Sequence, residues 1–354
     1  MQYFERMKEK FNNLKYKDRV IVLGIESSCD ETAISVVVNG REVLSNIIAS
    51  QIDIHTRFGG VVPEVASRNH IQAINNVFEL AIKEAGIEKS DIDAVAVTFG
   101  AGLIGALFVG VSFAKGLAYS LDVPLVAVNH IKGHISANYI ANKLLEPPFM
   151  CLVISGAHTS IFKITDYTKL ELLGQTLDDA VGEAFDKVAR VVGLGYPGGP
   201  KIEKLARVGK DNIVFKRQNS TKDSLNFSFS GIKTAVINYV NNAQMKGEEI
   251  NKADICASFQ SLVAKELASK IIRATKESGL NKIVLAGGVS ANRFLYEYIK
   301  NEAEKEGLEV FAPNTILCTD NGAMIASCGY YNIMAGVGLS DLNLTAKANI
   351  MYNN

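Results

Sequence analysis

Two histidines in one short segment are the first residues of this chain whose types and spacing suggest chemistry. The segment Asn129-His130-Ile131-Lys132-Gly133-His134 places them four residues apart, and the chain has only five histidines in all. On a helix, side chains four residues apart share a face, so both imidazoles could reach one metal ion. The spacing alone leaves a second interpretation open, two core or surface histidines without a metal.

A third ligand would have to be a carboxylate from elsewhere in the chain, and we expect Asp320 to supply it. This residue lies in Cys318-Thr319-Asp320-Asn321-Gly322, just before an apolar stretch that is typical of a helix. Two histidines and one carboxylate leave coordination positions open, as catalytic sites do, and the set suits Fe(II) or Zn(II) without choosing between them. The alternative is that Asp320 only caps the following helix.

Three glycine- or hydroxyl-rich turns could hold a phosphate through backbone N–H groups. They are Ser155-Gly156, Gly198-Gly199-Pro200 and Gly287-Gly288-Val289-Ser290, and the last opens a stretch that carries Asn292. Each turn is a weak indicator by itself, because glycine turns are common. No GxxxxGK[ST] sequence occurs, which argues against a Walker-type nucleotide site.

Charged residues mark two further segments. Acidic residues fall on a predicted helix at Asp178, Asp179, Glu183 and Asp186, where a solvated acidic face is the simpler interpretation of the first two. Basic and aromatic residues are interleaved farther on, at Lys210, Phe215, Lys216, Arg217, Lys222, Phe227, Phe229 and Lys233. Such a mixture could bind RNA, although Phe227 and Phe229 also alternate as core residues of a strand would.

The composition sets limits on the class of protein. A length of 354 residues with 48% hydrophobic residues predicts two domains. The 37 basic and 37 acidic residues balance, so the protein has no net charge that would attract it as a whole to nucleic acid or to an anionic membrane. Five cysteines without a CxxC pair, and a charged N-terminus, favour a reduced cytoplasmic protein over a secreted one. The uncharged run from Ala94 to Ala114 is broken by glycines, so we expect a buried strand and helix and no membrane span.

The elements that must position these residues follow a pattern used twice. An apolar strand, a polar turn and a returning strand occur at 20–38 and again at 151–164, and each hairpin is followed by a helical stretch and then a strand that runs into a glycine-rich turn. We therefore expect a charged leader over 1–18 and a first domain over 19–146 plus 320–354, which carries the metal ligands. The second domain, over 147–319, would carry the phosphate-binding turns.

Several segments together resemble the TsaD family of transfer RNA threonylcarbamoyltransferases, its bacterial branch in particular, from about Val20 onward. The matching segments are Gly24 to Thr32, Gly60 to His70, Asn129 to His134, Ser155 to Thr159, Gly182 to Lys187, Gly195 to Pro200, Phe227 to Thr234, Gly287 to Arg293 and Cys318 to Ala323. The resemblance implies an α/β fold of the actin-like (ASKHA) type, in which two duplicated RNase H-like domains face a ligand cleft.

The resemblance also implies a set of site residues. His130, His134 and Asp320 would hold one divalent metal ion, with Fe(II) ahead of Zn(II). The adenylate of the substrate would be bound by Val153, Ile154, Ser155, Gly156, Ala157, Asp186, Gly199, Glu203 and Asn292. Glu203 stands where many members have aspartate. Ala157 stands where the usual turn has a second glycine, so its methyl group would crowd a ligand unless the residue keeps an ordinary φ.

The activity implied is transfer of a threonylcarbamoyl group from threonylcarbamoyl-AMP to N6 of adenosine 37 in tRNAs that read ANN codons, forming t6A and releasing AMP. The partners implied are tRNA, a smaller inactive paralogue (TsaB-like) and a P-loop ATPase (TsaE-like), in the cytoplasm.

Three alternatives differ in class. A metallopeptidase of the HExxH type would need a glutamate at the position of Ile131. A small-molecule kinase or ATPase of the actin-like fold would not need the histidine pair. An inactive scaffold protein would not need all three metal ligands.

Overall fold

The chain forms two compact units. The structure is a computed structural model that describes residues 3–216 and 224–350. Unit 1 comprises Met1–Pro147, Asp166–Lys169 and Pro313–Asn354, and unit 2 comprises Pro148–Thr165 and Leu170–Ala312. These units are groups of residues in mutual contact rather than demonstrated domains, so the domain ranges given above stay a prediction.

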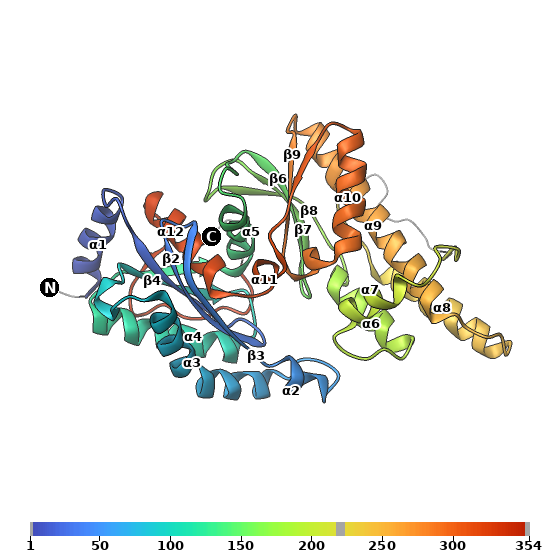
Figure 1. The fold of residues 1–354 in the computed structure, drawn as a ribbon, viewed down its shortest axis with the longest axis horizontal. Helices are drawn as coiled ribbons and strands as arrows, with labels where there is room; N and C mark the ends of the chain where they lie inside the picture. Colours follow the sequence, from blue (N-terminus) through green and yellow to red (C-terminus); the bar gives the residue numbers. More distant parts are fainter. Residues whose placement is uncertain (1–2, 217–223, 351–354) are drawn as a thin grey trace. The chain divides into compact units, whose positions relative to one another are not determined.

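In the described part of the chain, unit 1 is built on a six-stranded sheet in the order β11-β5-β4-β1-β2-β3 (Figure 1). The strands are β1 Ile21–Glu26, β2 Glu31–Val38, β3 Glu42–Ser50, β4 Ala94–Gly100, β5 Leu125–Asn129 and β11 Leu339–Ser340. β1 runs antiparallel to β2 and parallel to β4. Both faces of this sheet are covered by helices, which explains why β1 is a continuous apolar run instead of an alternating one.

The helices of unit 1 lie on opposite faces of that sheet. They are α1 Tyr3–Leu14, α2 Ile52–Thr56, α3 Pro63–Ala85, the short η1 Lys89–Asp91, α4 Ile104–Leu121, α5 His130–Ala141, α11 Thr315–Cys318 and α12 Gly322–Met334. Ile21 and Leu23 of β1 pack in one core with α3 and α4. Val20 and Val22 point to the other face and pack with α5 and α12.

The segment expected to be a charged leader is instead part of unit 1. Residues 3–14 form helix α1, whose buried residues Tyr3, Met7, Phe11 and Leu14 recur every three or four positions. The Tyr3 hydroxyl donates a hydrogen bond of 2.6 Å to the carbonyl of Val123. The charged residues that suggested a leader lie on the other face of this amphipathic helix.

Helix α4 is, in the described residues, the one helix long and apolar enough to cross a membrane by length and composition. Its small and branched residues Ala106, Leu107, Gly110, Val111, Ala114 and Ala118 are buried. Leu107 and Val111 pack in the same core as β1 and α3. A helix of this kind is a weak indicator of a membrane span, since the core helix of a globular protein has the same composition.

Unit 2 repeats the sheet of unit 1. Its described residues form a five-stranded sheet in the order β10-β9-β6-β7-β8. The strands are β6 Phe149–Ile154, β7 Thr159–Ile164, β8 Leu170–Gln175, β9 Lys282–Ala286 and β10 Glu309–Phe311. β6 pairs antiparallel with β7 and parallel with β9, as β1 pairs with β2 and β4, so the predicted duplication is confirmed.

The helices of unit 2 carry most of its apolar core. They are α6 Val181–Val191, α7 Gly198–Ala206, α8 Ser230–Met245, α9 Lys252–Glu277, the short η2 Gly288–Ala291 and α10 Arg293–Lys305 (Figure 1). Helix α9 lies at the centre of this core, where Phe259 packs edge-on against Phe185 of α6 with ring centroids 4.9 Å apart. The turns predicted to bind a phosphate therefore stand on a rigid base.

Candidate metal centre

Both histidines of the 129–134 segment lie on one side of α5. Asn129 ends β5 and caps the helix, because its side chain accepts a hydrogen bond of 2.9 Å from the N–H of Ile131. The helix therefore begins at His130 and brings His134 one turn later onto the same face, with ring centroids 4.6 Å apart. The residue between them, Gly133, faces α12, where a Cβ would lie 2.7 Å from Cδ1 of Ile325. A methyl group at this position would therefore displace the end of the Ile325 side chain.

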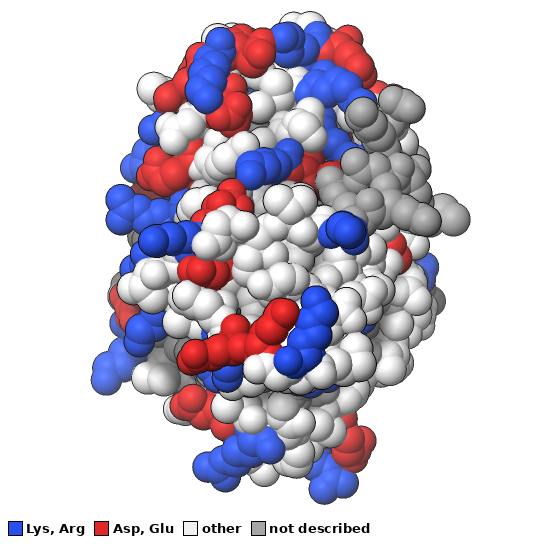
Figure 2. All heavy atoms as spheres, turned by 90° about the vertical axis from the view of Figure 1, so that its right-hand side faces the viewer, with Lys and Arg blue, Asp and Glu red and all other residues white. Residues whose placement is uncertain are grey.

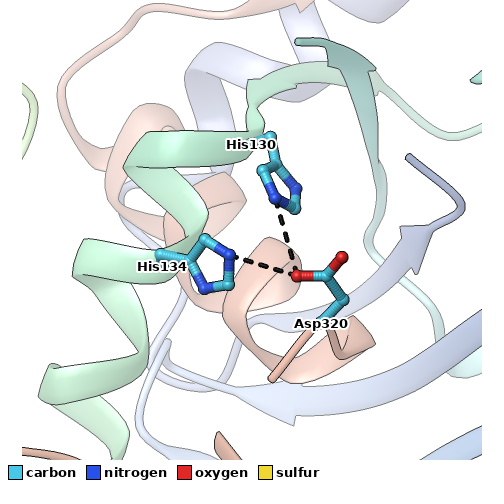
Figure 3. A group of neighbouring side chains, drawn as sticks. All are labelled: His130, His134 and Asp320. Atoms are coloured by element: carbon cyan, nitrogen blue, oxygen red, sulfur yellow. Dashed lines mark ion pairs between the residues drawn. The ribbon is translucent and has the colours of Figure 1, made fainter. Parts of the chain in front are cut away.

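Asp320 reaches the same point from the start of α12. Its Oδ1 lies 3.1 Å from Nε2 of His134 and 3.5 Å from Nε2 of His130 (Figure 3). The residue that caps α12 is Asn321, whose side chain accepts a hydrogen bond from the N–H of Met324. The alternative role of Asp320 as the cap of this helix is therefore wrong, and its carboxylate is directed at the histidines.

The three side chains form a group that fits a divalent cation. Their ligand atoms lie within 4.8 Å of one another. His134 is 1% exposed, and among the described residues neither of its ring nitrogens makes a hydrogen bond, although Nε2 lies 3.1 Å from Oδ1 of Asp320. A buried imidazole without a hydrogen bond is costly unless another group binds its lone pair, and a metal ion does so.

Negative charge is concentrated around this group. Burial alone would lower the pKa of His130, but the carboxylates of Asp320 and Glu26 outweigh it and raise the pKa to about 9. Burial, together with Asp30 and Asp320, raises the pKa of Glu31 to about 10. A divalent cation would neutralise part of this field, which makes the site electrostatically suited to one.

The predicted adenylate-binding turns belong to unit 2. The parallel strands β6 and β9 end side by side, so the turn after each lies at the same edge of the sheet. A Cβ on Gly182, in the first turn of α6, would lie 2.7 Å from the carbonyl oxygen of Ser155, and one on Gly287 would lie 2.5 Å from that of Ile154. These glycines let the backbones of three segments meet at one place.

The residues of the β6 turn have different exposures. Val153 and Ile154 are fully buried in β6 and can offer a ligand only their backbone. Gly156 and Ala157 are exposed. In the described residues the positive φ values of non-glycine residues are those of Asn39 and Asp122, so Ala157 keeps an ordinary φ and its methyl group faces solvent.

The remaining predicted substrate residues are tied to helix starts. Asp186 accepts a hydrogen bond of 2.7 Å from the N–H of Gly198, which fixes the turn that contains Gly199. Glu203 accepts a hydrogen bond of 3.3 Å from the N–H of Arg293, the residue after Asn292. Asn292 caps α10 through Leu295 and donates to Gln260 Oε1 at 3.1 Å.

A pocket of about 640 Å³ lies beside these residues in unit 2. Its lining includes Glu203, Arg207, Gln260, Arg293 and Phe294. Because Gln260 is also the partner of Asn292, the pocket connects two of the predicted substrate residues. Its mixture of an aromatic ring, alkyl stems and polar groups suits a heterocyclic base with a hydroxylated sugar.

The expectation of a solvated acidic face at Asp178 and Asp179 is wrong. Asp178 and Asp179 precede α6 rather than lying on it, and neither belongs to a free acidic face. Asp178 accepts hydrogen bonds from the N–H groups of Phe229 and Ser230 at the start of α8, and Asp179 pairs with Lys187 and Lys233. Asp178 is held there because the amide hydrogens at the start of a helix need acceptors, and Asp179 is held by the two lysine ammonium groups.

In the described part of the basic and aromatic segment, Phe227 and Phe229 belong to the core and offer no surface on which RNA bases could stack. Phe227 and Phe229 are fully buried and stack on each other with centroids 5.7 Å apart. Arg217 and Lys222 lie outside the described residues. Among the described residues, basic and acidic side chains are intermixed on the face shown in Figure 2 and form no continuous basic field.

The turn between β4 and α4 has the spacing GxGxxG, from Gly100 to Gly105, but its glycines serve packing. A Cβ on Gly100 would lie 2.4 Å from the carbonyl oxygen of Lys347, and one on Gly102 would lie 2.6 Å from that of Ser28. The protein's own backbone fills the space that a dinucleotide would need. The pattern therefore does not indicate a cofactor site.

Solved structures share the fold of this chain. HypF of T. kodakarensis aligns with a TM-score of 0.63 and 16% identity over 92% of this chain and 49% of its own. Component A of the Acidaminococcus fermentans (R)-2-hydroxyglutaryl-CoA dehydratase aligns with a TM-score of 0.52 and 14% identity over 89% of this chain and 99% of its own. At these identities the likeness concerns the fold alone, and it confirms the expected α/β, actin-like class.

Within that class the chain belongs to the TsaD family, described as tRNA N6-adenosine threonylcarbamoyltransferase, which residues 42–327 match. The protein of that name from Clostridium perfringens ATCC 13124 is 60% identical over 334 residues, covering 94% of this chain and 98% of the relative. The one from Clostridium beijerinckii is 57% identical over the same length and the same shares. The predicted family is confirmed, and the kinase and metallopeptidase alternatives are not favoured.

Proposed function

We propose that this chain transfers the threonylcarbamoyl group from threonylcarbamoyl-AMP to N6 of adenosine 37 in tRNAs that read ANN codons, forming t6A. Membership of the transferase family gives the type of reaction. The observation that carries the proposal is the convergence of His130, His134 and Asp320, with His134 buried and its Nε2 3.1 Å from the Asp320 carboxylate. Retention of the whole ligand set argues against the inactive scaffold.

The metal we propose is one divalent ion per chain, iron(II) ahead of zinc(II), held by His130, His134 and Asp320. When bound, it would orient the donor and act as a Lewis acid toward a carbonyl oxygen. Three protein ligands leave room for a substrate oxygen, as catalytic sites require. The group around it is mostly buried, with His130 9% and Asp320 19% exposed, which limits competition from water.

The adenylate part of the donor would bind to unit 2. The Ser155 to Ala157 turn and the starts of α6, α7 and α10 would face the phosphate, and a bound phosphate would share or replace the present acceptors of Val181, Gly198 and Arg293, which are Thr159, Asp186 and Glu203. Glu203 lines the pocket that would receive the adenosine, and Asn292 donates a hydrogen bond to Gln260 of the same lining. Asp186 would act by holding the turn of Gly198 and Gly199 in place.

The transfer is a displacement at the carbamoyl carbon. The N6–carbon bond forms and the bond from that carbon to the phosphate oxygen breaks, so AMP leaves with the electron pair and the amine loses a proton. An exocyclic purine amine is a weak nucleophile, since its lone pair is shared with the ring. Fixed positions for both substrates and stabilisation of the leaving phosphate therefore provide most of the acceleration.

We propose that the protein works in the cytoplasm with tRNA, a smaller inactive paralogue (TsaB-like) and a P-loop ATPase (TsaE-like). The balance of 37 basic and 37 acidic residues supports this, because a subunit with no net charge gains from partners that supply part of an RNA-binding surface. The burial of Phe227 and Phe229 agrees with it.

The test is nucleoside mass spectrometry of tRNA from cells depleted of this protein. Depletion should abolish threonylcarbamoyladenosine, and the wild type but not His134→Ala should restore it. Persistence of the nucleoside after depletion would refute the transferase proposal. Full rescue by His134→Ala would leave the reaction standing and remove the metal from it.

A further inference from the structure

The carboxylate of Glu26 lies behind His130, at the ring nitrogen opposite the one that faces Asp320. Oε2 of Glu26 is 3.0 Å from Nδ1 of His130, whereas Oδ1 of Asp320 is 3.5 Å from Nε2. Ser28 Oγ is a second neighbour of Nδ1, at 3.2 Å. The His130 ring is thus held between two carboxylates that belong to different elements.

Glu26 is itself fixed in place. It is the last residue of β1, its side chain is fully buried, and it stands beside the end of the parallel strand β4. Its Oε1 accepts a hydrogen bond of 2.5 Å from the N–H of Ser28, and its Oε2 accepts one of 2.6 Å from the hydroxyl of Thr98. A buried carboxylate held by a backbone donor and a hydroxyl has little freedom to rotate.

This arrangement selects one tautomer of His130. Because a carboxylate can only accept hydrogen bonds, the contact of Glu26 with Nδ1 is favourable when Nδ1 carries the proton and donates it. The lone pair then remains on Nε2, the nitrogen that faces Asp320. Without Glu26, the ring could adopt the other tautomer or turn about its χ2 angle.

We propose that Glu26 is a positioning residue that holds His130 in the orientation and tautomer required to bind the divalent cation. The inference rests on the metal site of the proposed function. Glu26 itself contributes no ligand, since its carboxylate lies on the far side of the His130 ring. Partners of this kind, which bind the second nitrogen of a ligating histidine, typically strengthen metal binding by about 10- to 100-fold.

The experiment is a titration of the full-length, metal-free protein with Co(II), followed by the visible absorption of the bound ion and by calorimetry. Glu26→Gln keeps the volume and removes the charge, so we expect Co(II) to bind about 10- to 100-fold more weakly and with an altered absorption spectrum. Glu42→Gln, an exposed carboxylate on β3, is the matched control and should bind as the wild type does.

A double-mutant cycle separates positioning from a general structural effect. In the His130→Ala background, Glu26→Gln should change the affinity for Co(II) by less than about twofold, because its effect is transmitted through His130. If Glu26→Gln fails to fold, Thr98→Val, which removes one donor to the carboxylate, should give a smaller loss of affinity in the same direction. The melting temperature of each metal-free variant shows which of them fold.

Two results would overturn the inference and are distinguishable from failure of the proposed function. Equal affinity and an unchanged spectrum in a folded Glu26→Gln variant would leave the metal site standing and refute the positioning role. A loss of affinity that is the same with and without His130 would show that Glu26 acts elsewhere. A wild-type protein that binds no Co(II) would instead refute the metal site itself.

Discussion

Asn129 and Asn321 have the same structural role on two helices that are far apart in the sequence. Each is buried, each accepts a hydrogen bond from the first turn of the helix it precedes, and each is the chain neighbour of a predicted metal ligand. The asparagine side chains thereby fix where α5 and α12 begin. Because His130 and Asp320 lie at those starts, the two caps determine where the ligands lie.

Replacement of Asn321 by alanine should destabilise unit 1 and weaken metal binding together. The side chain caps α12 through Met324 and donates to the carbonyls of Leu317 and Thr319, so we expect a loss of about 2 to 3 kcal/mol in unfolding free energy. Asn251→Ala removes a similar but exposed cap from α9 and should leave metal affinity unchanged. Urea denaturation and metal titration measure both effects, and unchanged metal affinity in Asn321→Ala would contradict the prediction.

Arg41 should be a main support for the histidine helix. Its guanidinium donates to the carbonyls of Lys143 and Leu145 at 2.8 and 2.9 Å, and to those of Tyr139 and Asn142 at 3.2 Å, at and beyond the end of α5. A cation that pairs several carbonyls at a helix C-terminus is favourable, so Arg41→Ala should cost about 2 to 3 kcal/mol.

Arg41→Lys should recover only part of that loss, because an ammonium group lacks the planar fork that reaches separate acceptors. Calorimetric melting of the wild type, both Arg41 variants and Arg57→Ala, an exposed arginine that serves as the control, tests the assignment. A melting temperature of Arg41→Ala equal to that of Arg57→Ala would refute it.

The stability of the protein should rise with pH in the acid range, in part through Asp178. Partial burial alone would raise its pKa, but the hydrogen bonds from Ser228 and Ser230 outweigh this and hold the pKa below its ordinary value. The unfolded chain therefore binds more protons, and the stabilisation is present above the unfolded pKa of about 4 and is lost as pH falls through the lower folded value. Urea denaturation between about pH 2 and pH 6 should show a shallower slope for Asp178→Asn.

Removal of metal should lower the melting temperature of the wild type but not of His134→Ala. A ligand that binds only the folded state at about 100 times its Kd adds about 2.7 kcal/mol to the stability. Calorimetry with and without a chelator measures this difference. An equal response of both proteins would mean that the ion binds somewhere other than the 130, 134 and 320 group.

Glycine at position 157 should change little. Ala157 keeps an ordinary φ and its methyl group is exposed, so Ala157→Gly removes no packing and only adds backbone freedom. We expect a loss of less than about 1 kcal/mol in stability and less than about a threefold change in affinity for an adenylate analogue. A large gain in affinity would show that the methyl group crowds the ligand.

The sequence by itself determined the local features of this protein. Apolar runs and polar turns identified both hairpins, because a strand that is covered on both faces is a continuous apolar run and is easy to recognise in the sequence. The spacing of His130 and His134 predicted their shared face, because helical periodicity is a property of the backbone alone. The strands β3 and β8 were missed, since most of their residues are half-buried or exposed and leave a weak pattern.

Tertiary structure decided which distant residues meet. Asp320 approaches the histidines because α12 packs against α5, and Glu26 lies behind His130 because the parallel strands β1, β4 and β5 lie side by side and β5 leads directly into His130. Asp178 and Asp179 find partners at the start of α8 and on two lysines, a pairing that their own neighbourhood in the sequence does not encode. These relationships depend on packing between elements far apart in the chain. Neither the hydrophobic periodicity nor the secondary-structure propensity of a short segment predicts such packing.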